Sequence, residues 1–183
     1  LSEKGIITLT RAGKSSLATL NFENYLLIDM LAAMELKRKQ TFLEKQTELQ
    51  MLLMEIETYC SQMGFIKSVS AIRPERNMKL NRVEILILLH NSEEAQHRKQ
   101  TLATHELIQT LQRIHTIRID YLILNSVESN NLLTSEEKNP LKEMLSDKIA
   151  FLHPQAFWMT IRDMLEKGFR IRFEDEETNP TKI

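Results

Sequence analysis

The chain has 183 residues, 42% of them hydrophobic and 27% charged, and a formal net charge of −1. This composition suits one medium globular domain or a small domain with an appendage, and it excludes an overall electrostatic attraction to nucleic acid or membranes. Any such contact must come from a local basic patch. The single cysteine, Cys60, excludes an internal disulfide framework. We expect it to be a buried core thiol in a cytoplasmic protein.

The first twenty residues predict a hairpin. LSEKG is typical of a helix end closed by Gly5, IITLT and SSLATLN predict two strands, and RAGK predicts the turn between them. This opening is typical of an element already under way, so we expect a segment before it. Arg11 and Lys14 lie about the turn, where they are either simply solvated or a pair of phosphate contacts.

The next forty residues are strongly helical in pattern. No proline or glycine occurs in residues 23–63, and two apolar clusters, 26–36 and 49–63, recur at helical spacing, which predicts one long helix or two. The polar middle, KRKQTFLEKQTE, suggests that each cluster packs against a different body. An unbroken helix would be roughly 60 Å long. We therefore expect a spacer helix that pairs in a homodimer.

After Gly64 the chain alternates between strands and helices. FIKSVSAI predicts a strand, RVEILILLH a strand buried on both faces, and IRIDYLILN a third strand. Residues 94–114 predict an amphipathic helix with one apolar stripe, formed by Ala103, Leu107, Leu111 and Ile114. A polar loop follows, then a helix from near Pro140, a short strand KIAFLH and a helix 154–168. No run approaches the roughly twenty apolar residues that span a bilayer, so no membrane contact is expected.

One loop and the strands around it carry a family resemblance. The order helix, strand, loop, strand in SVSAIRPERNMKLNRVEILILLHN resembles minimal nucleotidyltransferase domains of the DNA polymerase beta-like superfamily. In that family a Gly-Ser turn approaches the nucleotide phosphates, and an Asp-x-Asp strand holds divalent metal. The resemblance lays Ser70 and Ala71 on the Gly-Ser pair, Arg82 and Glu84 on the two aspartates, and Asp120 on a third carboxylate.

Two further stretches support this placement. IDYLILN and then LLTSEEKNPLKEMLSDKIAFLHPQAFW are similar to the segment that follows the catalytic strand in that family. The opening LSEKGIITLTRAGKSSLATLN resembles the last helix turn and wing of a winged helix-turn-helix domain. The implied fold class is α/β (α+β), with a mixed sheet and flanking helices. The expected divisions are a wing hairpin at 1–22, a spacer helix at 23–63, a nucleotidyltransferase-like domain at 64–168 and a charged tail at 169–183.

Both halves of the family motif are altered, which implies a degenerate site. Arg82 puts a fixed positive charge where metal would sit, and we expect it to pair with Glu84, Asp120 or a phosphate. Ala71 lacks the freedom of the glycine that permits close backbone approach. An aspartate near a strand start, such as Asp120, is also often a solvated or capping residue. We expect no catalytic residue, no metal and no cofactor; four cations remain as phosphate-binding candidates, Arg73, Arg76, Lys79 and Arg82.

The combined resemblances imply a DNA-binding transcriptional regulator. Its second domain would serve oligomerisation or ligand sensing, while Arg11 and Lys14 contact the DNA backbone. The expected partners are DNA, a second copy of the chain, and a nucleotide or phosphate ligand. Two alternatives stay open: an active Mg²⁺-dependent nucleotidyltransferase that uses Glu84 and Asp120, and a purely structural dimer module.

Overall fold

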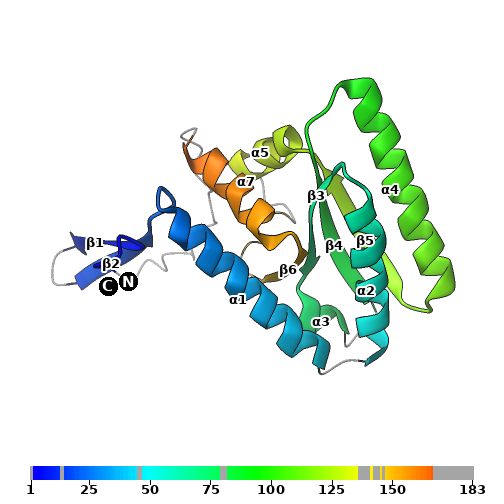
Figure 1. Cartoon of the computed structure of the whole chain (residues 1–183), viewed down its shortest axis with the longest axis horizontal. Coiled ribbons are helices and arrows are strands. Elements are labelled where there is room, and N and C mark those ends of the chain that lie inside the picture. Colours follow the sequence, from blue (N-terminus) through cyan, green and yellow to red (C-terminus); the bar gives the residue numbers. More distant parts are fainter. Residues whose placement is uncertain are drawn as a thin grey trace, which may run out of the picture.

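The computed structural model describes residues 2–12, 15–44, 47–78, 82–135, 141, 145 and 147–166. They form a two-stranded hairpin followed by a four-stranded sheet that has helices on both faces (Figure 1). This arrangement confirms the α+β class expected from the sequence. None of the helices in these ranges is both long enough and apolar enough to cross a bilayer.

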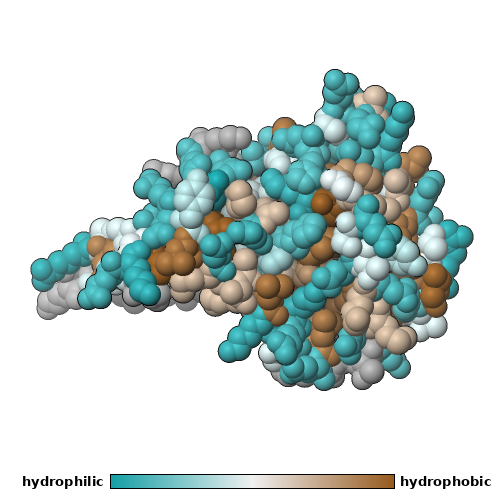
Figure 2. Space-filling view, viewed as in Figure 1, coloured by the Kyte–Doolittle hydropathy of each residue, from teal (hydrophilic) through white to brown (hydrophobic). Residues whose placement is uncertain are grey.

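The hairpin consists of β1 (Ile7–Ala12) and β2 (Ser15–Leu20), as the sequence predicts. Ile7 lies opposite Leu20 and Arg11 opposite Ser16, so Ile7 and Leu20 share one face with Arg11. The hairpin projects from the start of the first helix, away from the larger sheet (Figures 1 and 2). An isolated hairpin is marginally stable in water. Here the Asn24 side chain donates a hydrogen bond of 2.8 Å to the Lys4 carbonyl and ties the hairpin to the helix start.

The predicted long helical region is two helices, α1 (Tyr25–Glu44) and α2 (Thr47–Gln62). They contact each other, and Lys39 of α1 forms an ion pair of 2.5 Å with Glu57 of α2. The polar middle is largely exposed, as expected, although Phe42 within it is buried. The expectation that the two apolar clusters pack against different bodies is wrong, because α1 contacts β6 and α2 contacts β3 of the same sheet. Folding back buries both apolar faces in one domain, whereas an extended helix would leave them in water.

The four-stranded sheet has the order β5-β4-β3-β6. Its strands are β3 (Ile66–Ile72), β4 (Arg82–Leu89), β5 (Arg118–Leu124) and β6 (Lys148–Leu152). β4 pairs with β5 in parallel, and the β3–β4 and β3–β6 pairs are antiparallel. All four strands agree with the sequence prediction, and β4 is buried on both faces except at Arg82.

Helices cover the two faces of the sheet and divide the core. On one face, α2 and α4 (Glu94–Ile114) pack over a cluster that includes Ile56, Ile85 and Ile108. On the other, α5 (Ser126–Thr134) and α7 (Pro154–Glu166) pack over a cluster that includes Leu86 and Phe157. The short α3 (Pro74–Met78) connects β3 and β4. α1 crosses beside the edge strand β6 and contacts α7.

Two details of the core test the sequence predictions. Cys60 is fully buried, as expected, and burial raises the pKa of its thiol to about 12. The predicted stripe on α4 is partly wrong: Leu111 is buried, but Ile114 is 64% exposed and the buried face also holds Thr104. The Thr104 hydroxyl donates a hydrogen bond to the Gln100 carbonyl, which satisfies this polar side chain inside the core. The face of α4 that is buried is therefore turned about the helix axis from the predicted apolar stripe.

The loop after β5 also differs from expectation. Residues expected to form a polar loop instead form α5, which is capped by Asn125 and Glu128. The helix predicted near Pro140 lies largely outside the described residues, as do the end of the helix predicted at 154–168 and the charged tail.

Candidate functional site

The register of the sheet brings together the residues that the resemblance lays on the family's carboxylates: Arg82, Glu84 and Asp120. Arg82 and Glu84 are two residues apart on β4 and therefore point to the same face. Asp120 on β5 lies directly beside Glu84, and Ile72 at the end of β3 lies on its other side. Asp120, which is remote from Arg82 and Glu84 in the sequence, thus meets them at one end of the sheet.

Charged side chains at this point form a continuous row that alternates in sign. Arg73 Nη2 contacts Glu84 Oε2 at 2.8 Å, and Arg82 Nη2 contacts Glu84 Oε1. Arg82 Nε reaches Asp120 Oδ2 at 3.0 Å, and Arg118 Nε donates to Asp120 Oδ1 at 2.9 Å. The prediction that Arg82 pairs with Glu84 or Asp120 is confirmed, since it contacts both. We call these five residues the arginine–carboxylate cluster.

This geometry limits the chemistry of the cluster. Each of the four carboxylate oxygens of Glu84 and Asp120 faces a guanidinium group. Three guanidiniums surround two carboxylates, so the local charge is positive at the place where the resemblance would put a dication. The described residues contain no group of three or more histidine, cysteine, aspartate or glutamate side chains arranged to hold a metal. The ion pairs hold the β3–α3 turn, β4 and β5 together at this end of the sheet.

Ser70 and Ala71 do not occupy the turn that the resemblance implies. Both lie inside β3, where Ser70 is opposite Leu86 on one side and Ala150 on the other. Their backbone therefore lies in the middle of the sheet, which leaves no room for close approach of a phosphate. The turn comes two residues later, at Arg73, whose φ of 44° is a left-handed conformation that favours glycine. An arginine in this conformation carries backbone strain.

Two of the four phosphate-binding candidates lie in the described part of the site. Arg73 and Arg82 are part of the arginine–carboxylate cluster, while the Arg76 side chain and Lys79 lie outside the described residues. Sequence reasoning missed Arg118, although Arg118 and Asp120 repeat the arginine-x-acid spacing of Arg82 and Glu84.

Arg11, one of the two DNA-contact candidates, lies on the hairpin, remote from this cluster (Figure 1). Arg11 is exposed near the end of β1, and Lys14 falls outside the described residues. The structure therefore presents two separate features that need a functional interpretation, the projecting hairpin and the arginine–carboxylate cluster. Comparison with protein-family models, with curated proteins and with solved structures gave no match, so that interpretation depends on the geometry.

Proposed function

We propose that the chain is a DNA-binding regulator whose nucleotidyltransferase-like domain has no metal-dependent transfer activity. The observation that carries the second half is the arginine–carboxylate cluster, because Arg82 forms ion pairs with both Glu84 and Asp120 where a catalytic dication would bind. A dication there would have to displace a guanidinium that is held by two carboxylates. A regulator of this kind would work in the cytoplasm, in keeping with the single thiol.

The β1–β2 hairpin supports the DNA-binding half. It projects from the domain (Figure 2). The exposed Arg11 lies near the end of β1, as in a wing that lies against phosphates. A wing supplies backbone contacts and few base contacts, so its binding is weak and nonspecific. The net charge of −1 gives no general attraction to DNA that would produce the same effect.

We expect the chain to bind duplex DNA in low salt with strong salt dependence. Two phosphate contacts, from Arg11 and Lys14, give a slope near −1.8 on a log–log plot, or roughly tenfold weaker binding between 50 and 200 mM salt. Arg11→Glu should flatten the slope by about one unit. Fluorescence anisotropy with a labelled duplex measures both quantities.

Arg113→Glu is the matched control, because Arg113 is an exposed arginine on α4 and the substitution changes the net charge equally. It should leave the slope unchanged. If the unmodified chain shows no binding in low salt, or if Arg113→Glu acts like Arg11→Glu, the hairpin is not the DNA contact.

A homodimer along α1 remains part of the proposal. Leu27 is buried within the domain, but Leu26 and Leu36 on the same helix are about half exposed and are available to a second copy. Light scattering at micromolar concentration should give twice 21.4 kDa. The change Leu26→Glu with Leu36→Glu should halve that mass, whereas Leu102→Glu, at an equally exposed leucine on α4, should not. A monomer in the unmodified chain would contradict the dimer.

A further inference from the structure

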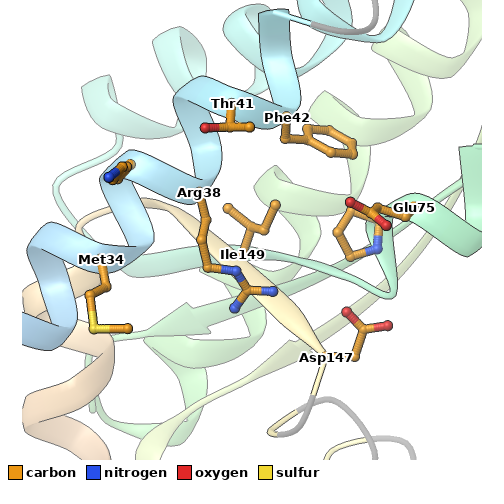
Figure 3. A pocket seen from close by; sticks show the side chains of 9 residues that line it. Met34, Arg38, Thr41, Phe42, Glu75, Asp147 and Ile149 are labelled. Atoms are coloured by element: carbon orange, nitrogen blue, oxygen red, sulfur yellow. The ribbon is translucent and has the colours of Figure 1, made fainter.

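A second charged feature lies beside α1. A cavity of about 530 Å³ opens between the second half of α1, the start of α3 and the start of β6. This volume falls within the range of small-molecule sites, roughly 300–1,000 Å³. Its floor is apolar and includes the buried side chains Phe42 and Ile149. Figure 3 shows Arg38 extending from α1 toward Asp147, with Glu75 on the same side as Asp147.

The charges of the cavity are separated by sign. Lys37 and Arg38 come from α1, and Glu75 and Asp147 come from the opposite wall. Within the described residues, none of these four side chains has a hydrogen bond or an ion pair. The facing charges thus lie too far apart to neutralise each other directly, and a ligand between them would meet cations on one side and carboxylates on the other.

Neighbouring groups show why Arg38 has no ion pair with its own helix among the described residues. Glu35, one turn earlier on α1, is the nearest carboxylate along the helix, but both of its oxygens are used. Oε1 accepts from Lys148 Nζ at 2.5 Å, and Oε2 accepts from the Ala150 amide at 3.0 Å. Glu35 therefore does not draw the Arg38 guanidinium away from the cavity.

The cavity is distinct from the arginine–carboxylate cluster. Ile149 pairs with Ala71, which pairs with Ile85, and all three belong to the core cluster under α2 and α4. Glu84 is the residue next to Ile85 and therefore points to the opposite face of the sheet. The Arg73 amide donates a hydrogen bond of 2.8 Å to the Asp147 carbonyl, so the backbone of the β3–α3 turn links the two sites.

We propose that this cavity binds a small zwitterion, a molecule with a carboxylate at one end, an ammonium group at the other and an apolar stretch between them. The carboxylate pairs with Lys37 and Arg38, the ammonium group pairs with Glu75 and Asp147, and the apolar stretch covers Phe42 and Ile149. This assigns a ligand class to a site that the DNA-binding proposal does not use, and neither proposal depends on the other.

The test uses linear ω-amino acids as probes, because they carry the two charges at adjustable separation. Calorimetric or NMR titration of the chain with 4-aminobutanoate, 6-aminohexanoate and 8-aminooctanoate compares the separations. Two singly charged compounds serve as controls: hexanoate carries only the carboxylate, and hexylamine carries only the ammonium group. We expect one amino acid in the series to bind about tenfold more tightly than either singly charged compound, since each end adds a charge-assisted contact.

Substitutions at two exposed residues test the cationic and the acidic end of the cavity separately. Arg38→Ala should weaken binding of the best amino acid and of hexanoate but not of hexylamine, and Asp147→Asn should weaken binding of the amino acid and of hexylamine but not of hexanoate. Arg98→Ala, on the remote helix α4, should change none of these affinities. The proposal is overturned if no amino acid binds more tightly than the singly charged compounds, or if Arg38→Ala and Asp147→Asn leave its affinity unchanged.

Discussion

Lys148→Met is expected to lower the free energy of unfolding by about 3–5 kcal/mol, the largest single effect we foresee. Lys148 forms an ion pair with Glu35 in which the two side chains are only 1% and 4% exposed. Its ammonium group also lies over the Phe157 and Trp158 rings. Burial lowers the pKa of Lys148, and Glu35 offsets that effect only in part. Removing the lysine alone leaves the Glu35 carboxylate buried without its cation.

Urea unfolding of a double-mutant cycle measures this effect. Glu35→Gln combined with Lys148→Met should recover most of the lost stability, because the uncharged amide oxygen still accepts from the Ala150 amide. The matched control is Arg98→Ala in the exposed Glu94–Arg98 pair, whose side chains are 80% and 76% exposed. It should cost less than about 0.5 kcal/mol. A Lys148→Met protein as stable as the unmodified chain would show that the ion pair is not buried.

Glu84→Ala is expected to have the second largest effect, a loss of about 2–3 kcal/mol of stability. The Glu84 side chain is 10% exposed and holds Arg73 and Arg82, which are about a third exposed, so solvent softens the cost of leaving them unpaired. Asp120→Ala should cost about 1 kcal/mol, because Asp120 and Arg118 are more exposed. Urea unfolding of the two variants side by side checks this order.

Glu84→Ala also distinguishes the proposed regulator from the alternative of an active nucleotidyltransferase. We expect no product when the unmodified chain is incubated with ATP, GTP or CTP and Mg²⁺, since Arg82 lies between Glu84 and Asp120. Calorimetry with and without Mg²⁺ would detect metal-independent phosphate binding, which should be lost in Arg82→Asp. Product that disappears in Glu84→Ala would refute the proposed lack of transfer activity. Equal stability of Glu84→Ala and the unmodified chain would contradict the ion-pair geometry instead.

Elements with a strong local pattern could be predicted from the sequence. The hairpin, β3 to β6 and most of α4 follow from hydrophobic periods and turn residues, which act within a few positions along the chain. α5 was missed although its signal is local: Asn125 caps the helix and Glu128, three residues on, completes the capping box. The segment is rich in polar residues, which favoured the prediction of a loop although the sequence contains this helix N-terminal signal.

Only the tertiary structure decided how those elements meet. Hydrophobic period identifies an apolar helix face but not its partner, so the folding back of α2 beside α1 appears only in the packed domain. The pairing of Glu35 with Lys148 joins residues that are far apart in the chain. A charged residue in a sequence is predicted to be exposed, because burying a charged side chain is favourable only when the folded structure places an opposite charge beside it. The sequence by itself determined the strands and most of the helices and predicted that Arg82 pairs with Glu84, Asp120 or a phosphate, and packing decided that Arg82 contacts both carboxylates.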